Sequence, residues 1–200
     1  DRIASVRTTL KTTSAMKLVA SARLRKGQSL IENMHPYQER LGDILHTAIA
    51  CMSASPGIDA LCRSRAEGES PRVAIVAISS NSSLCGAFNS NVIREVTNRL
   101  DALKEESAEV TVYSVGRKMV DAMRRAGHVS PQDLNLLVSH PSYEASAELA
   151  QHLIDAFVDG RFDRVEFIYN HFVSTANQKV VTETYLPMAR PACGTEDELP

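Results

Sequence analysis

The segment whose residue types come nearest to phosphate chemistry is the loop Ser79–Asn89. It follows a short apolar run and precedes an amphipathic stretch, which is where nucleotide-binding proteins place a glycine-rich loop. A dinucleotide fingerprint needs several spaced glycines, and a P-loop needs a Lys after its last glycine. This loop contains only Gly86 and no Lys. Free amides at the helix start could still hold an anion, but capping of the helix by Asn89 or Ser90 is the favoured interpretation.

Cys85, in the same loop, is a candidate nucleophile because a helix N-terminus lowers the pKa of a thiol. A catalytic thiol also needs a base, and the histidines of this half are scattered without order: His128, His140, His152 and His171. Pairing in space stays open, but a packed or exposed structural cysteine is favoured. Three carboxylates occur singly at the ends of expected helices and strands: Asp159, Asp163 and Glu166. We expect them to lie on a solvated rim rather than in an active site.

The familiar catalytic and metal-binding motifs are absent, including H-E-x-x-H, G-x-S-x-G and C-x-x-C. The four cysteines are Cys51, Cys62, Cys85 and Cys193. A secreted disulfide set is one interpretation, but no apolar segment of a signal peptide follows Asp1, and a chain of this size can build a core without cross-links. We therefore expect reduced thiols, no cofactor, no metal and no active site.

Composition indicates a folded protein without a strong global charge. Of 200 residues, 44% are hydrophobic and 23% are charged, and the formal net charge is −2. These values predict a packed core and give no general attraction to nucleic acid or acidic membranes. The longest apolar run, 73–78, is far shorter than the roughly 20 residues that cross a bilayer.

The N-terminal segment predicts a long helix with an apolar stripe. Apolar or small residues recur there at steps of three and four: Val6, Leu10, Thr13, Ala20, Leu24, Gly27, Ile31 and Met34. This is the spacing of a coiled coil, interrupted at Lys17. We expect Pro36 to bend the helix rather than end it, so that helix continues to about Ser53. At about 1.5 Å per residue such a helix is roughly 75–80 Å long, more than the rest of the chain can cover.

The same segment is basic. Residues 1–28 contain one acid, Asp1, and seven cations: Arg2, Arg7, Lys11, Lys17, Arg23, Arg25 and Lys26. Such an arm could bind nucleic acid, an anionic membrane or a protein. Residues 1–34 lack the aromatic side chains that the first two partners favour, and small residues fill the centre of the helix. A partner protein is therefore favoured, and a solvated helix is the remaining alternative.

Beyond the helix, strands and helices alternate. We expect residues 1–54 to form the long helix, 55–71 a linker, 72–191 an α/β domain and 192–200 an acidic tail. Within the domain, strands are expected at 73–79, 110–115, 164–172 and 179–186, and helices at 89–104, 117–126 and 143–159. This order predicts a small three-layer, Rossmann-like fold with a mostly parallel sheet, whose last strand is antiparallel.

The run from Ile3 to Gln28, IASVRTTLKTTSAMKLVASARLRKGQ, is similar without a gap to the first helix of the γ subunits of F-type ATP synthases. His35-Pro36-Tyr37 falls where that family has R-P-Y, and Leu84–Asn89 resembles its G-L-C-G-x-x-N block. Gly160–Asp163 and Tyr185–Pro187 fit the same order. The sequence departs from the family at Ser82-Ser83, where a charged residue and Gly are usual, and it stops at Pro200, where the family continues into a second long helix.

The resemblance implies the central shaft of a rotary ATP synthase, which carries no catalytic site of its own. Such a subunit couples ion-driven rotation of the membrane ring to ATP synthesis in the ring of α and β subunits. Its partners are the α, β, ε and c subunits, with no nucleic acid, at the cytoplasmic face of a bacterial plasma membrane. Two alternatives are a small nucleotide-binding domain, which should have a phosphate loop, and a coiled-coil adaptor, which would not explain the L-C-G block.

The resemblance also implies which residues meet partners. Those expected to face the ring of α and β subunits are Arg7, Lys11, Met16, Lys17, Arg23, Arg25 and Cys85. Those expected to lie at the foot, toward ε and the c ring, are His35, Tyr37 and Glu39.

Overall fold

The protein consists of a long helix and an α/β body, seen in a computed structural model that describes residues 1–51, 55–64, 70–174 and 177–190. The helix α1 (Arg2–Cys51) belongs to one compact unit, and the body, within Ser53–Arg190, is the other. The long helix and the mostly parallel sheet that the sequence predicts are both confirmed.

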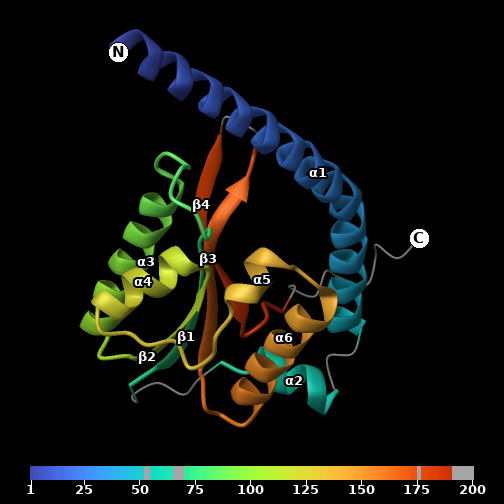
Figure 1. Ribbon diagram of the computed structural model, residues 1–200. Coiled ribbons are helices and arrows are strands. Elements are labelled where there is room, and N and C mark those ends of the chain that lie inside the picture. The colour runs from blue at the N-terminus through green and yellow to red at the C-terminus, as the bar shows by residue number, and fades with distance from the viewer. Residues whose placement is uncertain (52–54, 65–69, 175–176, 191–200) are drawn as a thin grey trace. The chain divides into compact units, whose positions relative to one another are not determined.

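Helix α1 runs unbroken for 50 residues, or about 75 Å, and continues through Pro36. Its axis curves along its length (Figure 1). Near the N-terminus, threonine hydroxyls donate to carbonyls one turn back, as from Thr9 to Ser5 at 3.0 Å and from Thr13 to Thr9 at 2.8 Å. Of its side chains only Ile49 is buried, so packing inside this unit cannot account for the helix.

The body is built on four strands in the order β2-β1-β3-β4. Strands β1 (Arg72–Ile78), β2 (Glu109–Val115) and β3 (Arg164–Phe172) are parallel, whereas β4 (Gln178–Leu186) is antiparallel to β3. The central strand β1 is almost wholly buried because both of its faces are covered.

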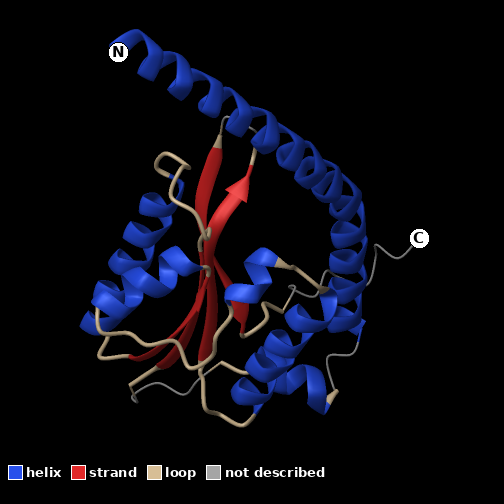
Figure 2. Cartoon of the chain, viewed as in Figure 1, coloured by secondary structure: helices blue, strands red, loops and turns tan. Residues whose placement is uncertain are grey.

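Helices cover both faces of the sheet (Figures 1 and 2). On one face lie α3 (Phe88–Glu105) and α4 (Arg117–Arg125), and on the other lie α5 (Asn135–Ser139) and α6 (Tyr143–Val158). Successive β1 residues point to opposite faces, so Val73 and Ile75 pack in one core and Ala74 and Val76 in the other. The body therefore has two cores of its own, one on each side of the sheet.

Two helices were not predicted, α5 and α2 (Pro56–Cys62). Helix α2 lies in the segment expected to be a linker, and it packs against α6. The amide of Met188 donates to the carbonyl of Leu61 at 2.9 Å, and Arg190 pairs with Asp59, so this part of the expected linker is bound to the end of the body. The expected acidic tail, 192–200, lies outside the described residues.

Glu166, expected on a solvated rim, is instead buried, with its side chain 3% exposed. Arg99 of α3 donates to both of its oxygens, Nε to Oε2 at 2.8 Å and Nη2 to Oε1 at 2.6 Å, and the Nε of Arg164 lies 2.8 Å from Oε1. The bond to Glu166 raises the pKa of Arg99 above its ordinary value. A buried carboxylate needs such pairing, because desolvation without a partner costs several kcal/mol.

Asp163, from the same expected rim, is also bound. Its Oδ2 accepts from the amide of Arg72 at 2.8 Å, and its carboxylate pairs with the guanidinium of that residue at 3.1 Å. These bonds join the start of β1 to the turn before β3. Asp159 alone matches the expectation, since it is exposed and only 3.4 Å from the exposed Arg161.

Gly116 connects β2 to α4 where the ends of β1 and β2 are held together by a bond from the Ser79 amide to the Val115 carbonyl, 2.8 Å long. Its φ is +93°, and a Cβ there would lie 2.3 Å from the Ser79 carbonyl oxygen. Gly127 has a similar φ of +89°, but a Cβ there would meet no atom within 4 Å. The two glycines therefore share backbone strain but differ in available space.

We predict that Gly127→Ala lowers the free energy of unfolding by about 1–2 kcal/mol, from backbone strain alone. Gly116→Ala should lower it by about 2 kcal/mol more, because the strand ends must also separate. The free energy of unfolding of each variant is measured by urea unfolding, followed by the near-ultraviolet circular dichroism of the tyrosines. Equal losses in the two variants would show that the close approach of Gly116 to Ser79 is unimportant.

Candidate functional site: the long helix and the loop after β1

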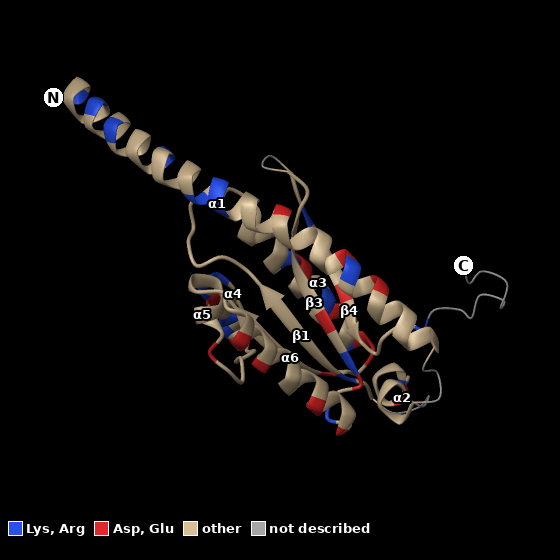
Figure 3. Ribbon diagram, turned by 90° about the vertical axis from the view of Figure 1, so that its right-hand side faces the viewer, with Lys and Arg blue, Asp and Glu red and all other residues tan. Residues whose placement is uncertain are grey.

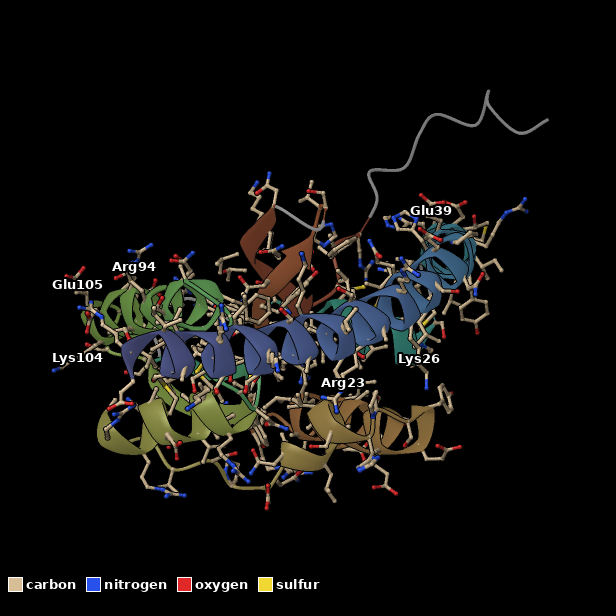
Figure 4. The ribbon with its side chains drawn as sticks, turned by 45° about the horizontal axis from the view of Figure 1, so that its top comes forward. Arg23, Lys26, Glu39, Arg94, Lys104 and Glu105 are labelled. Atoms are coloured by element: carbon tan, nitrogen blue, oxygen red, sulfur yellow. The ribbon has the colours of Figure 1, made fainter. Side chains whose placement is uncertain are left out.

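The exposed cations of α1 are concentrated in its first half. Figure 3 shows Lys and Arg through this half, whereas the acids Glu32, Glu39 and Asp43 occur only in the second half. Side chains such as those of Arg23 and Lys26 extend away from the helix axis (Figure 4). Every residue from Asp1 to Lys26 is exposed, so all the predicted contact residues of this segment are accessible in this chain.

These cations do not share one face of α1. At about 3.6 residues per turn, Arg7 and Arg25 lie on the same side of α1, about five turns apart, and Lys11 is close to their line. Met16 and Arg23 lie together on another side, about two turns apart. Positive charge is thus offered to partners on more than one side of the helix.

Lys17 belongs to neither group, because it lies in the apolar stripe. It is seven residues from both Leu10 and Leu24, which places the three side chains on one line about two turns apart. Leu10 is 65% exposed and Leu24 is 47% exposed. The stripe continues through Ile31 and Met34, which are exposed as well. Large apolar side chains at this spacing form the surface that a second helix covers in a coiled coil.

Two of the residues expected at the foot, His35 and Glu39, lie about one helical turn apart on α1. The Nδ1 of His35 is 3.4 Å from Oε1 of Glu39, an i,i+4 pair in which both side chains are exposed. Such a pair contributes about 0–1 kcal/mol at most. Tyr37 is also exposed. The structure therefore brings His35 and Glu39 together without giving them a buried site.

Asn89 organises the loop after β1 rather than capping α3, which corrects the sequence-based expectation. Its Oδ1 accepts from the amide of Ser80 at 3.0 Å, and its Nδ2 lies 2.9 Å from the carbonyl of Ser82 and 3.1 Å from the Sγ of Cys85. Helix α3 begins at Phe88 with no side-chain cap, and the Ser90 hydroxyl donates to the Ala87 carbonyl. The side chain of Asn89, 8% exposed as a residue, thus fixes the loop from within.

The loop is also tied to its neighbours. The Asn81 side chain accepts from the amide of Arg117 at 2.9 Å and donates to the hydroxyl of Ser139 at 2.9 Å. These bonds tie the loop to the start of α4 and to the end of α5. Leu84, beside Cys85, is 92% exposed on this fixed support. An apolar side chain held out from a rigid loop is suited to contact with another protein.

Cys85 has no catalytic surroundings in the described part of the chain. No described histidine hydrogen-bonds to it, and His152 is instead bound to the hydroxyl of Tyr113 at 3.0 Å. Burial raises the pKa of Tyr113, which keeps that hydroxyl neutral. Among the described residues no group of His, Cys, Asp or Glu is placed to hold a metal ion.

Among the described residues, no single helix is both long and apolar enough to cross a membrane. Helices α1 and α2 counted together reach the required length and mean hydropathy, but only as a pair with a break between them.

Comparisons with known proteins agree on one family. The family described as ATP synthase matches residues 1–198. The ATP synthase gamma chain of Phocaeicola vulgatus is 46% identical over 190 residues, which cover 94% of this chain and 63% of that protein. For the gamma chain of Bacteroides thetaiotaomicron the identity is 43%, with coverage of 94% and 61%. This chain therefore spans a little under two thirds of the length of these curated relatives.

A solved structure gives the same result for the fold. The chain resembles a chain of the central stalk and c-ring structure of the Tetrahymena thermophila mitochondrial ATP synthase, with a TM-score of 0.58 and 25% identity. The match covers 88% of this chain and 72% of that one.

We predict that Asn89→Ala loosens the loop and exposes Cys85. In a variant whose other cysteines are Ser, its reaction with a neutral maleimide should be about fivefold faster, which corresponds to about 1 kcal/mol of lost loop stability. Asn98→Ala, at an exposed position of the same helix, should leave the rate unchanged. The role given to Asn89 is wrong if both variants react at the rate of the parent.

Proposed function

The chain belongs to the family of ATP synthase γ chains, and from this premise we propose that it is part of the central-stalk rotor of an F-type ATP synthase. In this role it couples ion-driven rotation of the membrane ring to ATP synthesis in the ring of α and β subunits. The rotor itself makes and breaks no covalent bond. It transmits torque, so its essential properties are length, stiffness and asymmetric contact surfaces.

The observation that carries the proposal is the exposed apolar stripe on a helix of about 75 Å. A stripe with coiled-coil spacing must be covered for the helix to be stable in water. We propose that a second long helix of the complete polypeptide covers it, because the relatives are about half as long again as this chain. The remaining sides of α1 then face other subunits.

The charges suggest which surfaces these sides meet. With the stripe covered, the side that carries Arg7, Lys11 and Arg25 stays available for acidic groups of the catalytic ring, as does the side of Met16 and Arg23. The rigid loop with Leu84 and Cys85 offers an apolar contact to the same ring. His35, Tyr37 and Glu39 would lie toward ε and the c ring.

The same proposal gives a location. The chain would be held at the cytoplasmic face of a bacterial plasma membrane through the complex, without crossing the membrane itself. Its curated relatives come from bacteria, and the mitochondrial structure that it resembles combines the central stalk with the c ring.

The proposal is tested by purifying the affinity-tagged full-length protein from its native membranes under mild detergent. We expect α and β subunits to accompany it in a constant ratio, together with ATPase activity that the protein lacks when expressed alone. Recovery of the protein by itself, or in a complex without α and β, would refute the rotor assignment.

A second prediction tests the stripe alone. In the isolated full-length protein, Leu24→Asp should lower the free energy of unfolding of the helical shaft by about 2–4 kcal/mol, because it places a charge in the coiled-coil seam. Leu18→Asp is a matched control, since Leu18 is equally apolar and 74% exposed but lies off the stripe. It should cost less than about 0.5 kcal/mol.

Far-ultraviolet circular dichroism during urea unfolding separates the two variants. If Leu18→Asp were as destabilising as Leu24→Asp, the partner helix would not lie along the stripe defined by Leu10, Leu24 and Ile31.

A further inference from the structure

A cavity of about 370 Å³ opens in the α/β body at the carboxyl ends of β1 and β2, beside the first half of β3. We call it the carboxyl-edge cavity. Strands β1, β2 and β3 contribute Val76, Val115 and Phe167, and helices α5 and α6 contribute Val138, Leu149 and Ala150. All of these residues belong to one compact unit, so the cavity is a property of the body alone.

The cavity lies where this class of fold binds ligands. The chain passes from β1 to β2 on one side and then to β3 on the other side of β1, so the connections diverge at β1. Open α/β sheets bind small molecules in the crevice outside the strand ends at such a switch point. The loop after β1, which would hold a phosphate in a nucleotide-binding protein, is here fixed by Asn89 and contains one glycine.

The lining defines the chemistry of the ligand. None of the residues around the cavity is charged, so it has no group to neutralise a phosphate or a carboxylate. Its two hydroxyls belong to Ser79 and Ser146. The Ser146 hydroxyl donates its proton to the Ser142 carbonyl at 2.9 Å, and the Ser79 oxygen accepts from the Met119 amide at 2.8 Å. The Ser79 hydroxyl donates toward the Ser80 carbonyl at 3.3 Å, so both serine oxygens keep acceptor capacity, and Ser146 is the exposed one of the two, open to a ligand.

The size of the cavity agrees with a small ligand rather than with an extended partner. Ligand pockets are typically about 300–1,000 Å³, mainly apolar, with few polar groups. A volume of about 370 Å³ suits a molecule of two or three rings. A helix or strand of another protein would need a long groove instead.

We propose that the carboxyl-edge cavity binds a small, uncharged aromatic molecule that carries a single hydrogen-bond donor. Apolar contacts with Val76, Phe167 and Leu149 supply the affinity, and the Ser146 oxygen accepts the donor. This binding is separate from the rotor role, because it uses residues of the body that the long helix does not provide.

The test uses N-phenyl-1-naphthylamine, an uncharged aromatic amine with one N–H, whose fluorescence rises in apolar surroundings. Titration of the full 200-residue chain should give saturable binding with a stoichiometry of one. Ala150→Phe places a ring in the cavity and should weaken this binding at least tenfold. Ala147→Phe is the matched control, because Ala147 is on the same helix but does not line the cavity; its affinity should equal that of the parent.

Urea unfolding checks that Ala150→Phe folds. If it does not, Val138→Phe, which fills the same cavity from α5, replaces it as the test variant. The sulfonated analogue 8-anilino-1-naphthalenesulfonate should not compete for the same site, because no cation lines it. The proposal fails if the probe does not saturate or if it binds the filled variants as tightly as the parent. It also fails if the full-length protein does not bind the probe, since the cavity is then filled by another part of the polypeptide.

Discussion

The apolar stripe of α1 is the constraint on which the rest of the molecule depends. A large apolar side chain left in water forgoes about 1.5–3 kcal/mol of stabilisation, and Val6, Leu10, Leu24, Ile31 and Met34 are all exposed. Most helical stability in proteins comes from packing of an apolar face, so this stripe calls for cover from outside its own unit. The body does not share this dependence, because its central strand is buried between two cores. The body thus has buried cores of its own, whereas the apolar stripe of α1 has none among the described residues of its unit.

Much of the fold could be predicted because its signals are periodic. Alternation of apolar runs with amphipathic stretches gave the parallel strands and α3, α4 and α6, and steps of three and four gave α1. Helices α2 and α5 were missed because seven and five residues are too few to show a helical period. Glu166 was misplaced for another reason. A carboxylate in a strand suggests a solvated position, and its burial depends on Arg99, which is 67 residues away in the sequence.

The candidate site shows a similar division. The positions of Arg7, Lys17 and Arg23 around α1 follow from the helical period alone, so their spread over several sides was accessible from the sequence. The role of Asn89 was not. An asparagine at a helix start favours capping, but here its amide bonds to Ser80, Ser82 and Cys85, and the outcome depends on the shape of the preceding loop.

The carboxyl edge of the sheet shows how one fold serves a different purpose. In nucleotide-binding relatives of this architecture, glycines keep the loop after the first strand open for phosphate. In this chain the Asn89 side chain holds the amide of Ser80 and the carbonyl of Ser82, and the Asn81 side chain ties the same loop to Arg117 and Ser139. Leu84 is then held outward on a support with little freedom to yield. For a subunit proposed to transmit torque, such stiffness is useful, because a contact that deformed under load would dissipate the motion it should transmit. The side-chain hydrogen bonds of Asn81 and Asn89 thus supply, in a loop with a single glycine, the stiffness that such a contact needs.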